Sequence, residues 1–385
     1  MNVAGEGTEH EKMMTGGRTS ASVAYTYTTS YVTLRGTKCY RHIWEPSSND
    51  NSNDNGNSMK SETKTSKSNG LVVLYHGFLA HGAYPTVRYA AEFLAAAHLG
   101  NYTVVSYDFP GHGLSAGLAG YLPNADELIA VGVAMVENAQ QSTQQHPDPD
   151  VPLILCGSSM GGTIALAVAH TVTQQQEAAA ATASTSKQPA PKPPLVILMA
   201  PMLQLKVSSL ERFGLQCLAL VAPTVKLIPS NATDLTQQYR DAHKRQECAD
   251  DTATVAAAQA AVRAAASASA SESTTNTTCT DSLSMSDSTD ATSNKNIRVG
   301  SALTCVDLTW QIVAECADMT VPYLVLVADE DVVVQNTGAE YFHTHNAATD
   351  RTLLHYPALH GILCEPAPLF ATIQADILQW LAQRV

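Results

Sequence analysis

The sequence lacks several features that would place it in other functional classes. Its eight cysteines form no C-x-x-C pair and no spacing typical of zinc ligands, so we expect no metal site. Lysine and arginine gather in no segment and the net charge is −13, whereas nucleic-acid-binding proteins normally carry a basic surface. The sequence therefore predicts neither a metal cofactor nor a nucleic-acid partner.

Long apolar runs are also absent. The longest, 213–229, is shorter than the ~20 residues of a membrane span and contains Gln216, Lys226 and two prolines. Residues 1–17 (MNVAGEGTEHEKMMTGG) have no apolar run of the kind that a signal peptide requires. We therefore expect a cytoplasmic protein with reduced cysteines and no transmembrane helix.

Several segments have the composition of unfolded chain. Residues 1–20 are expected to be disordered, and the tracts 47–69, 174–194 and 254–296 are low-complexity insertions. Such segments bury too little apolar surface to offset the entropy of ordering them. The remaining chain, roughly 270 residues, is long enough to bury one large core.

Short apolar runs alternate with helical patterns along the rest of the chain. The predicted strands are 71–75, 104–107, 152–156, 195–199, 323–327 and 352–355, and the predicted helices are 84–98, 124–138, 160–172, 337–346 and 367–383. Strands without a polar face must be covered on both sides, as in a parallel sheet flanked by helices. The alternation therefore predicts an α/β fold with its active site at the carboxyl ends of the strands.

One of these strand ends carries a candidate nucleophile. GSSMG at 157–161 fits the G-x-S-x-G pattern of a nucleophile elbow, and it places Ser159 between a predicted strand and a predicted helix. GLSAG at 113–117 fits the same pattern around Ser115, but it follows a loop and opens no helix. We therefore predict Ser159 as the nucleophile.

A serine nucleophile needs a base and an acid that orients the base, and in this fold both follow the serine in the chain. Asp329 and Asp331 come directly after the strand 323–327, and His360 follows the strand 352–355. His345 and Asp350 form an H-x4-D pattern associated with acyl transfer, but it lies at a predicted helix end. The order of the residues predicts His360 as the base and leaves both acids open.

The transition state of acyl transfer also needs donors for a negatively charged oxygen. The amide of Met160 follows the nucleophile, and the amide of Phe78 lies in the segment His76-Gly77-Phe78, which follows the strand 71–75 directly. We expect these two amides to form the oxyanion hole. His76 and His112 lie in neighbouring loops, and we expect both to brace their loops without taking part in the chemistry.

Four segments resemble plant- and algal-type monoacylglycerol lipases, whose relatives include lysophospholipases and caffeoylshikimate esterases. They are DFPGHGLSAGLAGYLPNADELI at 108–129, GSSMGGTIAL at 157–166, APML at 200–203 and KLIPSNATDLTQQYRDAHKRQ at 226–246. The resemblance implies the α/β-hydrolase fold, with Ser159 as nucleophile and Phe78 as first oxyanion donor. The family's H-G-x-x-D segment aligns with 327–331, which selects Asp331 although the His and Gly are missing here. Its Y-x-x-A-x-H-like ending aligns with 356–360 and supports His360.

The resemblance also implies a domain organisation. The core would comprise 21–201 and 319–385, and a mobile helical cap would comprise 202–318 with the unusual 254–296 insertion. By the same resemblance, the apolar segment 213–228 would line an acyl channel and touch membrane. The alternative is an ordinary buried helix, and the sequence does not distinguish the two.

These observations predict a serine esterase or lipase without cofactors. A Ser159–His360–Asp331 triad would transfer the acyl group of a monoacylglycerol or lysophospholipid first to the enzyme and then to water. Three alternatives stay open: an acyltransferase with the same triad, an amide hydrolase like related aminopeptidases, and a non-catalytic ligand-binding protein on the same fold.

Overall fold

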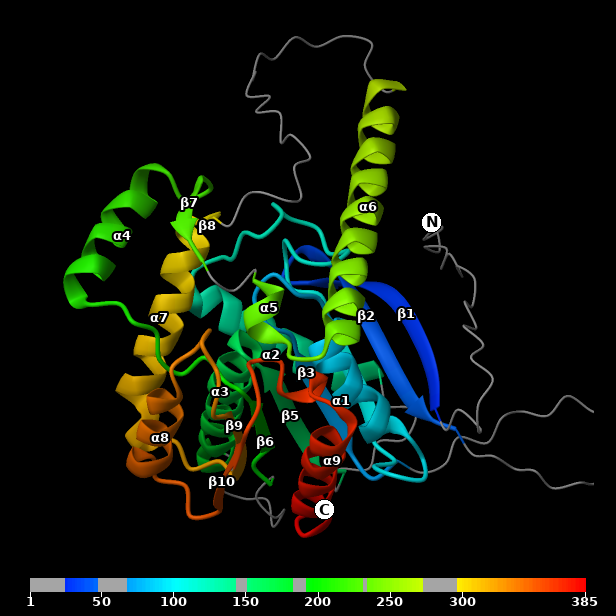
Figure 1. Ribbon diagram of the computed structural model, residues 1–385, viewed down its shortest axis with the longest axis vertical. Helices are drawn as coiled ribbons and strands as arrows, with labels where there is room; N and C mark the ends of the chain where they lie inside the picture. Colours follow the sequence, from blue (N-terminus) through cyan, green and yellow to red (C-terminus); the bar gives the residue numbers. More distant parts are fainter. Residues whose placement is uncertain (1–24, 48–67, 143–150, 183–191, 231–233, 273–295) are drawn as a thin grey trace, which may run out of the picture.

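The computed structural model describes residues 25–47, 68–142, 151–182, 192–230, 234–272 and 296–385 (Figure 1). The disorder predicted for 1–20 lies outside the described residues, as do most of the 47–69 tract and parts of the other two tracts. Cys279 lies outside them too, and the seven described cysteines are free thiols. Within the described ranges, no helix combines the length and the apolarity needed to cross a bilayer.

A central sheet of eight strands, in the order β1-β2-β4-β3-β5-β6-β9-β10, organises the described chain. The strands are β1 (Tyr25–Leu34), β2 (Thr37–Pro46), β3 (Leu71–Tyr75), β4 (Thr103–Tyr107), β5 (Leu153–Ser158), β6 (Leu195–Met199), β9 (Tyr323–Ala328) and β10 (Arg351–Tyr356). Every pair from β4 to β10 in this order is parallel, and the pairs β1–β2 and β2–β4 are antiparallel. The predicted, mostly parallel sheet is thus confirmed.

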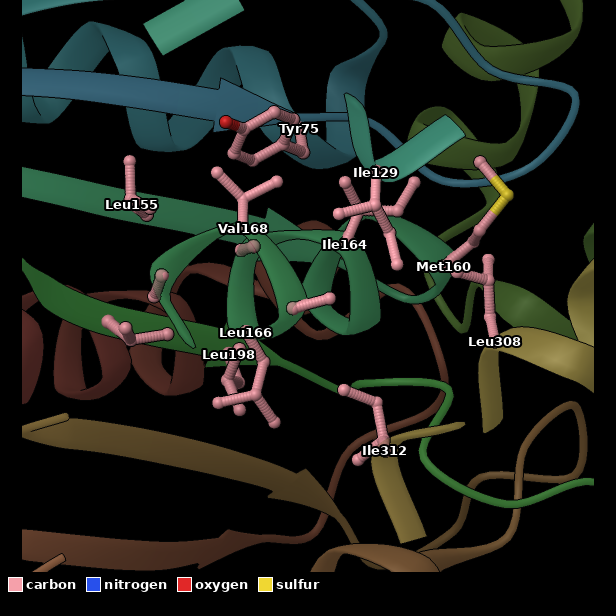
Figure 2. Packing of buried hydrophobic residues seen from close by; sticks show 14 of the residues in the cluster. Tyr75, Ile129, Leu155, Met160, Ile164, Leu166, Val168, Leu198, Leu308 and Ile312 are labelled. Carbon is pink, nitrogen blue, oxygen red and sulfur yellow. The ribbon is translucent and has the colours of Figure 1, made fainter. Parts of the chain in front are cut away.

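Helices cover both faces of this sheet and create two apolar cores. On one face lie α1 (Pro85–Ala95) and α9 (Ala367–Ala382); on the other lie α2 (Ala125–Ser142), α3 (Met160–Thr182), α7 (Val299–Glu315) and α8 (Asn336–His345). Figure 2 shows Val168 of α3 beside Tyr75 of β3, and Ile164 beside Ile129 of α2. Each fully buried side chain of this kind stabilises the fold by about 1.5–3 kcal/mol. The two cores hold the strand ends that carry the candidate site residues.

Several local expectations were wrong. The helix expected at 160–172 continues to Thr182, and α6 (Ala242–Glu272) extends into the 254–296 tract, so parts of two low-complexity segments are helical. Both segments are rich in alanine, which favours helix intrinsically even where it buries little surface. The hairpin of β1 and β2 was missed because β1 is mostly exposed and has no apolar run.

The chain between β6 and β9 forms α4 (Ser209–Val221), β7 (Lys226–Pro229), α5 (Leu235–Gln238), α6, β8 (Asn296–Arg298) and α7. In Figure 1, α6 extends away from the sheet and α4 lies at the periphery beside α7. A capping box of Ser208 and Glu211 begins α4, and none of its residues is buried. Phe213 is 62% exposed and Leu220 85% exposed. Of the two alternatives for the 213–228 segment, the ordinary buried helix is therefore wrong.

Candidate active site

Ser159 occupies a strained turn between β5 and α3. Its φ is +55°, a left-handed backbone conformation that residues other than glycine rarely adopt. Backbone hydrogen bonds hold it on both sides: the Ser159 N–H donates to Met199 O, and the Ser159 carbonyl accepts from the Met202 N–H, both at 3.0 Å. A serine in this conformation is what the G-x-S-x-G pattern predicted.

The glycines on either side of Ser159 are required by close packing. A Cβ atom on Gly157 would overlap the carbonyl of Gly161, and one on Gly161 would overlap the carbonyl of Tyr75. A Cβ atom on Gly77 would lie 3.4 Å from Ser159 Cβ and 4.0 Å from its Oγ. The loop that follows β3 thus lies directly against the elbow.

Asp331 and His360 form a buried pair. The Asp331 Oδ2 atom lies 2.6 Å from Nδ1 of His360, and Oδ1 accepts hydrogen bonds from the N–H groups of Val333 and Val334 at 2.7 and 3.0 Å. The side chains are 0% and 7% exposed. Asp331 follows β9 and His360 follows β10; these strands and β5 are parallel members of one sheet. The carboxyl ends of β5, β9 and β10 therefore bring Ser159 and this pair to the same edge.

Two other predicted candidates have different partners. Asp329 lies 2.6 Å from Nδ1 of His355, and these side chains are 48% and 43% exposed. In the H-x4-D segment, His345 is the last residue of α8, and its Nδ1 lies 2.8 Å from the Tyr341 carbonyl. Asp350 forms an ion pair with Arg384 at 2.6 Å. Neither arrangement resembles a buried acid–base pair.

Ser115 has a structural position. Its hydroxyl donates to the Asp108 carbonyl at 2.7 Å and accepts from the Tyr40 N–H at 2.8 Å. These bonds fasten the loop after β4 to β2. The second G-x-S-x-G match thus lies in a braced loop rather than in an elbow.

The amides of Phe78 and Met160 lie on the two segments that meet at Ser159. Phe78 follows Gly77, which packs against the elbow, and Met160 is the first residue of α3. Neither N–H donates a hydrogen bond to another described residue. Both donors are thus free to bind an anion, and the positive end of the α3 dipole favours negative charge at Met160.

His76 braces the loop that carries Phe78. Its Nε2 accepts from the Phe109 N–H at 3.0 Å, so Nδ1 carries the proton and donates to the Gly77 carbonyl at 2.7 Å. Burial, with the neighbouring His112, lowers the pKa of His76 to about 3. Burial also lowers the pKa of His112, whose Nδ1 lies 3.1 Å from the Pro110 carbonyl. Both rings are therefore neutral at pH 7, in keeping with the bracing role predicted for them.

A third group of polar side chains was missed by sequence reasoning. Ligand atoms of His42, His81 and Asp108 lie within 4.8 Å of one another. Hydrogen bonds already engage them: His42 lies between Asp108 at 2.9 Å and the Tyr27 hydroxyl at 2.7 Å, and His81 lies 2.5 Å from Asp251. Burial alone would raise the pKa of Asp108, but His42 and the other nearby histidines hold it well below its usual range. We assign this group a structural role that joins β2, the loop after β4 and α6.

The strand order, the elbow at Ser159 and the buried pair of Asp331 and His360 define an α/β-hydrolase. Within that class, the chain belongs to the family described as serine aminopeptidase, S33 (Hydrolase_4), which matches residues 66–367. No curated protein matches the sequence.

Solved structures of low sequence identity share this fold. A soluble variant of the Saccharomyces cerevisiae monoglyceride lipase, in complex with a substrate analog, has a TM-score of 0.64 at 16% identity, covering 95% of this chain and 99% of that one. The Paleococcus ferrophilus monoacylglycerol lipase has a TM-score of 0.55 at 18% identity, covering 82% and 95%. The enol-lactonase of Burkholderia xenovorans has a TM-score of 0.51 at 13% identity, covering 92% and 100%. At these identities the likeness establishes the fold alone.

Proposed function

We propose that the protein is a serine esterase that hydrolyses a monoacylglycerol or a lysophospholipid. The observation that carries this proposal is the 2.6 Å contact between Asp331 and His360, at the sheet edge where Ser159 holds its left-handed backbone. A buried imidazole oriented by a carboxylate is a general base for a serine hydroxyl. The segments that resemble plant- and algal-type monoacylglycerol lipases suggest the lipid class of the ester.

The reaction proceeds in two halves. In the first, Ser159 Oγ attacks the ester carbonyl while Nε2 of His360 takes its proton, and Asp331 holds the proton on Nδ1. The His360 imidazolium then protonates the departing alcohol, which leaves an acyl-enzyme. In the second half, His360 activates water, which releases the fatty acid and restores the Ser159 hydroxyl.

The oxyanion hole would supply much of the rate enhancement. The amides of Phe78 and Met160 donate to no acceptor in the described part of the chain, so they can bind the negatively charged oxygen of each tetrahedral intermediate. One such donor stabilises the transition state by about 3 kcal/mol in other serine hydrolases. His76 supports this function indirectly, because it fixes the loop on which Phe78 lies.

The outer surface of α4 supports a lipid substrate. Leu210, Leu220 and Val221 are at least 80% exposed, and they lie on the chain that follows the carboxyl end of β6. Large exposed apolar side chains on one short helix are typical of a surface that contacts lipid. We propose that α4 rests on the membrane or micelle from which the substrate is taken.

The test compares wild type with Ser159→Ala on a short p-nitrophenyl ester, a monoacylglycerol, a lysophospholipid and an aminoacyl p-nitroanilide. We expect hydrolysis of the esters by wild type only, together with fluorophosphonate labelling of Ser159. Because the family is described as serine aminopeptidase, amide hydrolysis is the specific alternative to ester hydrolysis. Preferential cleavage of the anilide would favour that alternative. Folded wild-type protein that neither labels nor hydrolyses would indicate a binding protein and overturn the proposal.

A further inference from the structure

The chain between α5 and α6 lies directly against the loop that carries His360. The Gly361 N–H donates to the Gln238 carbonyl at 2.9 Å. The buried ring of Tyr239 occupies the space where a side chain on Gly361 would have to be placed. A segment inserted between β6 and β9 thus forms one wall of the loop next to the proposed base.

Arg240, the next residue, reaches both loops of the proposed acid–base pair. Its Nη2 lies 3.0 Å from Glu330, which directly precedes Asp331, and donates to the Pro357 carbonyl at 3.3 Å. Its Nε lies 3.3 Å from Oε2 of Glu365. One guanidinium therefore joins the loop after β9 to both sides of the loop after β10.

Glu365 connects this guanidinium to the backbone next to His360. Its Oε1 accepts a hydrogen bond from the Leu359 N–H at 2.6 Å. Its side chain is only 2% exposed, and among the described residues Oε2 has no hydrogen-bond donor, which leaves Arg240 as its ionic partner. A buried carboxylate is costly unless a cation compensates it, so the position of Glu365 depends on Arg240.

We propose that Arg240 and Glu365 are positioning residues that keep His360 aligned with Asp331. The inference rests on the proposed function, because it assigns these residues to the same acid–base pair. Neither side chain touches the reacting atoms; they act on the backbone at Leu359 and Pro357 and on the side chain of Glu330. The pair of Arg240 with Glu330 is exposed on both sides and adds little to global stability. Loss of Arg240 leaves the buried Glu365 carboxylate uncompensated, so we expect Arg240→Ala to lose some stability, and its turnover is measured under conditions where the variant is folded.

Arg240→Ala tests this on a short p-nitrophenyl ester, which is small enough not to depend on lipid binding. Misplacement of a catalytic group by about 1 Å can cost about 100-fold in rate, so we expect kcat to fall about 10- to 100-fold with KM within about twofold of wild type. Arg240→Lys keeps the charge beside Glu365 but cannot make all three contacts, and it should recover part of the loss. Arg35→Ala is the matched control: Arg35 is similarly exposed and pairs with Glu127 at 2.9 Å on α2.

A double-mutant cycle with Glu365→Gln separates positioning from a general loss of structure. The glutamine oxygen can still accept from the Leu359 N–H but carries no charge that Arg240 must compensate. We therefore expect Arg240→Ala to cost less in the Glu365→Gln background than in wild type. Should Arg240→Ala not fold, Arg240→Lys takes its place in the cycle.

The outcomes distinguish this inference from the proposed function. If wild type is inactive and unlabelled by fluorophosphonate, the proposed function fails, and with it this inference. If wild type is active and Arg240→Ala behaves like Arg35→Ala, the function stands and the inference is overturned. Independent, multiplicative effects of the Arg240 and Glu365 substitutions would also contradict it.

Discussion

Asp331 lies 2.6 Å from the imidazole of His360, with its other carboxylate oxygen held by two backbone amides. Asp329, two residues earlier, faces a different histidine at the surface. The backbone turn after β9 thus assigns one acid to the interior and the other to solvent. Substituting each aspartate in turn therefore tests which of the two is the acid of the proposed triad.

Asp331→Asn should lower kcat for a p-nitrophenyl ester by about three to four orders of magnitude, because an amide favours the wrong imidazole tautomer. Asp329→Asn removes only an exposed pair with His355, which contributes little, and should leave kcat within about twofold of wild type. Steady-state kinetics on the two variants decides between them. Equal losses would mean that Asp331 is not the acid.

Ser115→Ala should affect stability and spare activity. The substitution removes the donor to the Asp108 carbonyl and leaves the Tyr40 N–H without its acceptor, which should cost about 1–3 kcal/mol in the free energy of unfolding. Urea denaturation measures that loss, and ester hydrolysis at a temperature where the variant is folded measures activity. An inactive but fully stable Ser115→Ala protein would contradict the assignment of Ser159.

The elbow could be predicted from sequence because its demands are local. Gly157 and Gly161 are needed wherever a strand turns sharply into a helix, so five residues suffice to identify Ser159. For the partner of His360, the order along the chain left Asp329 and Asp331 open, and only the resemblance to monoacylglycerol lipases selected Asp331. The geometry of the Asp331–His360 pair depends on β9 and β10 being parallel neighbours. The sequence predicts both strands but does not show that they are paired.

Other features depend on contacts that no local pattern shows. The group around His42 and Asp108 exists because β2 pairs antiparallel with β4, and β2 was itself missed. The contacts of Arg240 with Glu330 and Glu365 join segments far apart in the chain. The helical extent of α6 was missed for another reason: a segment that can bury little apolar surface is expected to be unfolded, whereas alanine favours helix by itself.

Alanine substitutions at two glycines should have opposite effects on stability. Gly157→Ala places a Cβ atom against the Gly161 backbone, so we expect severe destabilisation and loss of activity. Gly214 lies inside α4, and beyond the backbone of its own helix no atom of the described residues lies within 4 Å of its would-be Cβ, so Gly214→Ala should stabilise the protein by about 0.5–1 kcal/mol. Thermal unfolding of both variants provides the measurement. A well-folded, active Gly157→Ala protein would refute the steric account of the elbow.

Stability should decrease as the pH falls below about 6.5. Burial lowers the pKa of His76 to about 3, so between pH 6.5 and 3 the unfolded chain binds a proton that the folded protein does not. The free energy of unfolding contributed by this group is fully present above pH 6.5 and declines at up to about 1.4 kcal/mol per pH unit below it. His112 contributes in the same direction, because burial lowers its pKa as well.

His76→Gln tests this dependence. Glutamine does not titrate, so the variant should show a shallower decline between pH 6.5 and 4 even if it is less stable at pH 7. Urea denaturation across that range gives the slopes for both proteins. An unchanged slope would mean that His76 is not a source of the pH dependence.

Exposed apolar residues of α4 should matter for lipid and not for soluble substrates. Leu220 is 85% exposed and Phe213 62% exposed, so neither side chain contributes much to the folded core. If they enter a bilayer, replacing each with serine forfeits about 1.5–3 kcal/mol of transfer free energy, or roughly tenfold or more in partitioning. Phe213→Ser and Leu220→Ser should therefore weaken sedimentation with phosphatidylcholine vesicles and slow hydrolysis of vesicle-borne monoacylglycerol.

The control for this prediction is Leu99→Ser, which changes a 44% exposed leucine in the loop before β4, at the amino ends of the strands. It should leave vesicle binding unchanged, and all three variants should hydrolyse a short p-nitrophenyl ester like wild type. The difference between the two substrates then separates membrane contact from chemistry. If the α4 variants and Leu99→Ser bind vesicles equally well, α4 does not contact lipid.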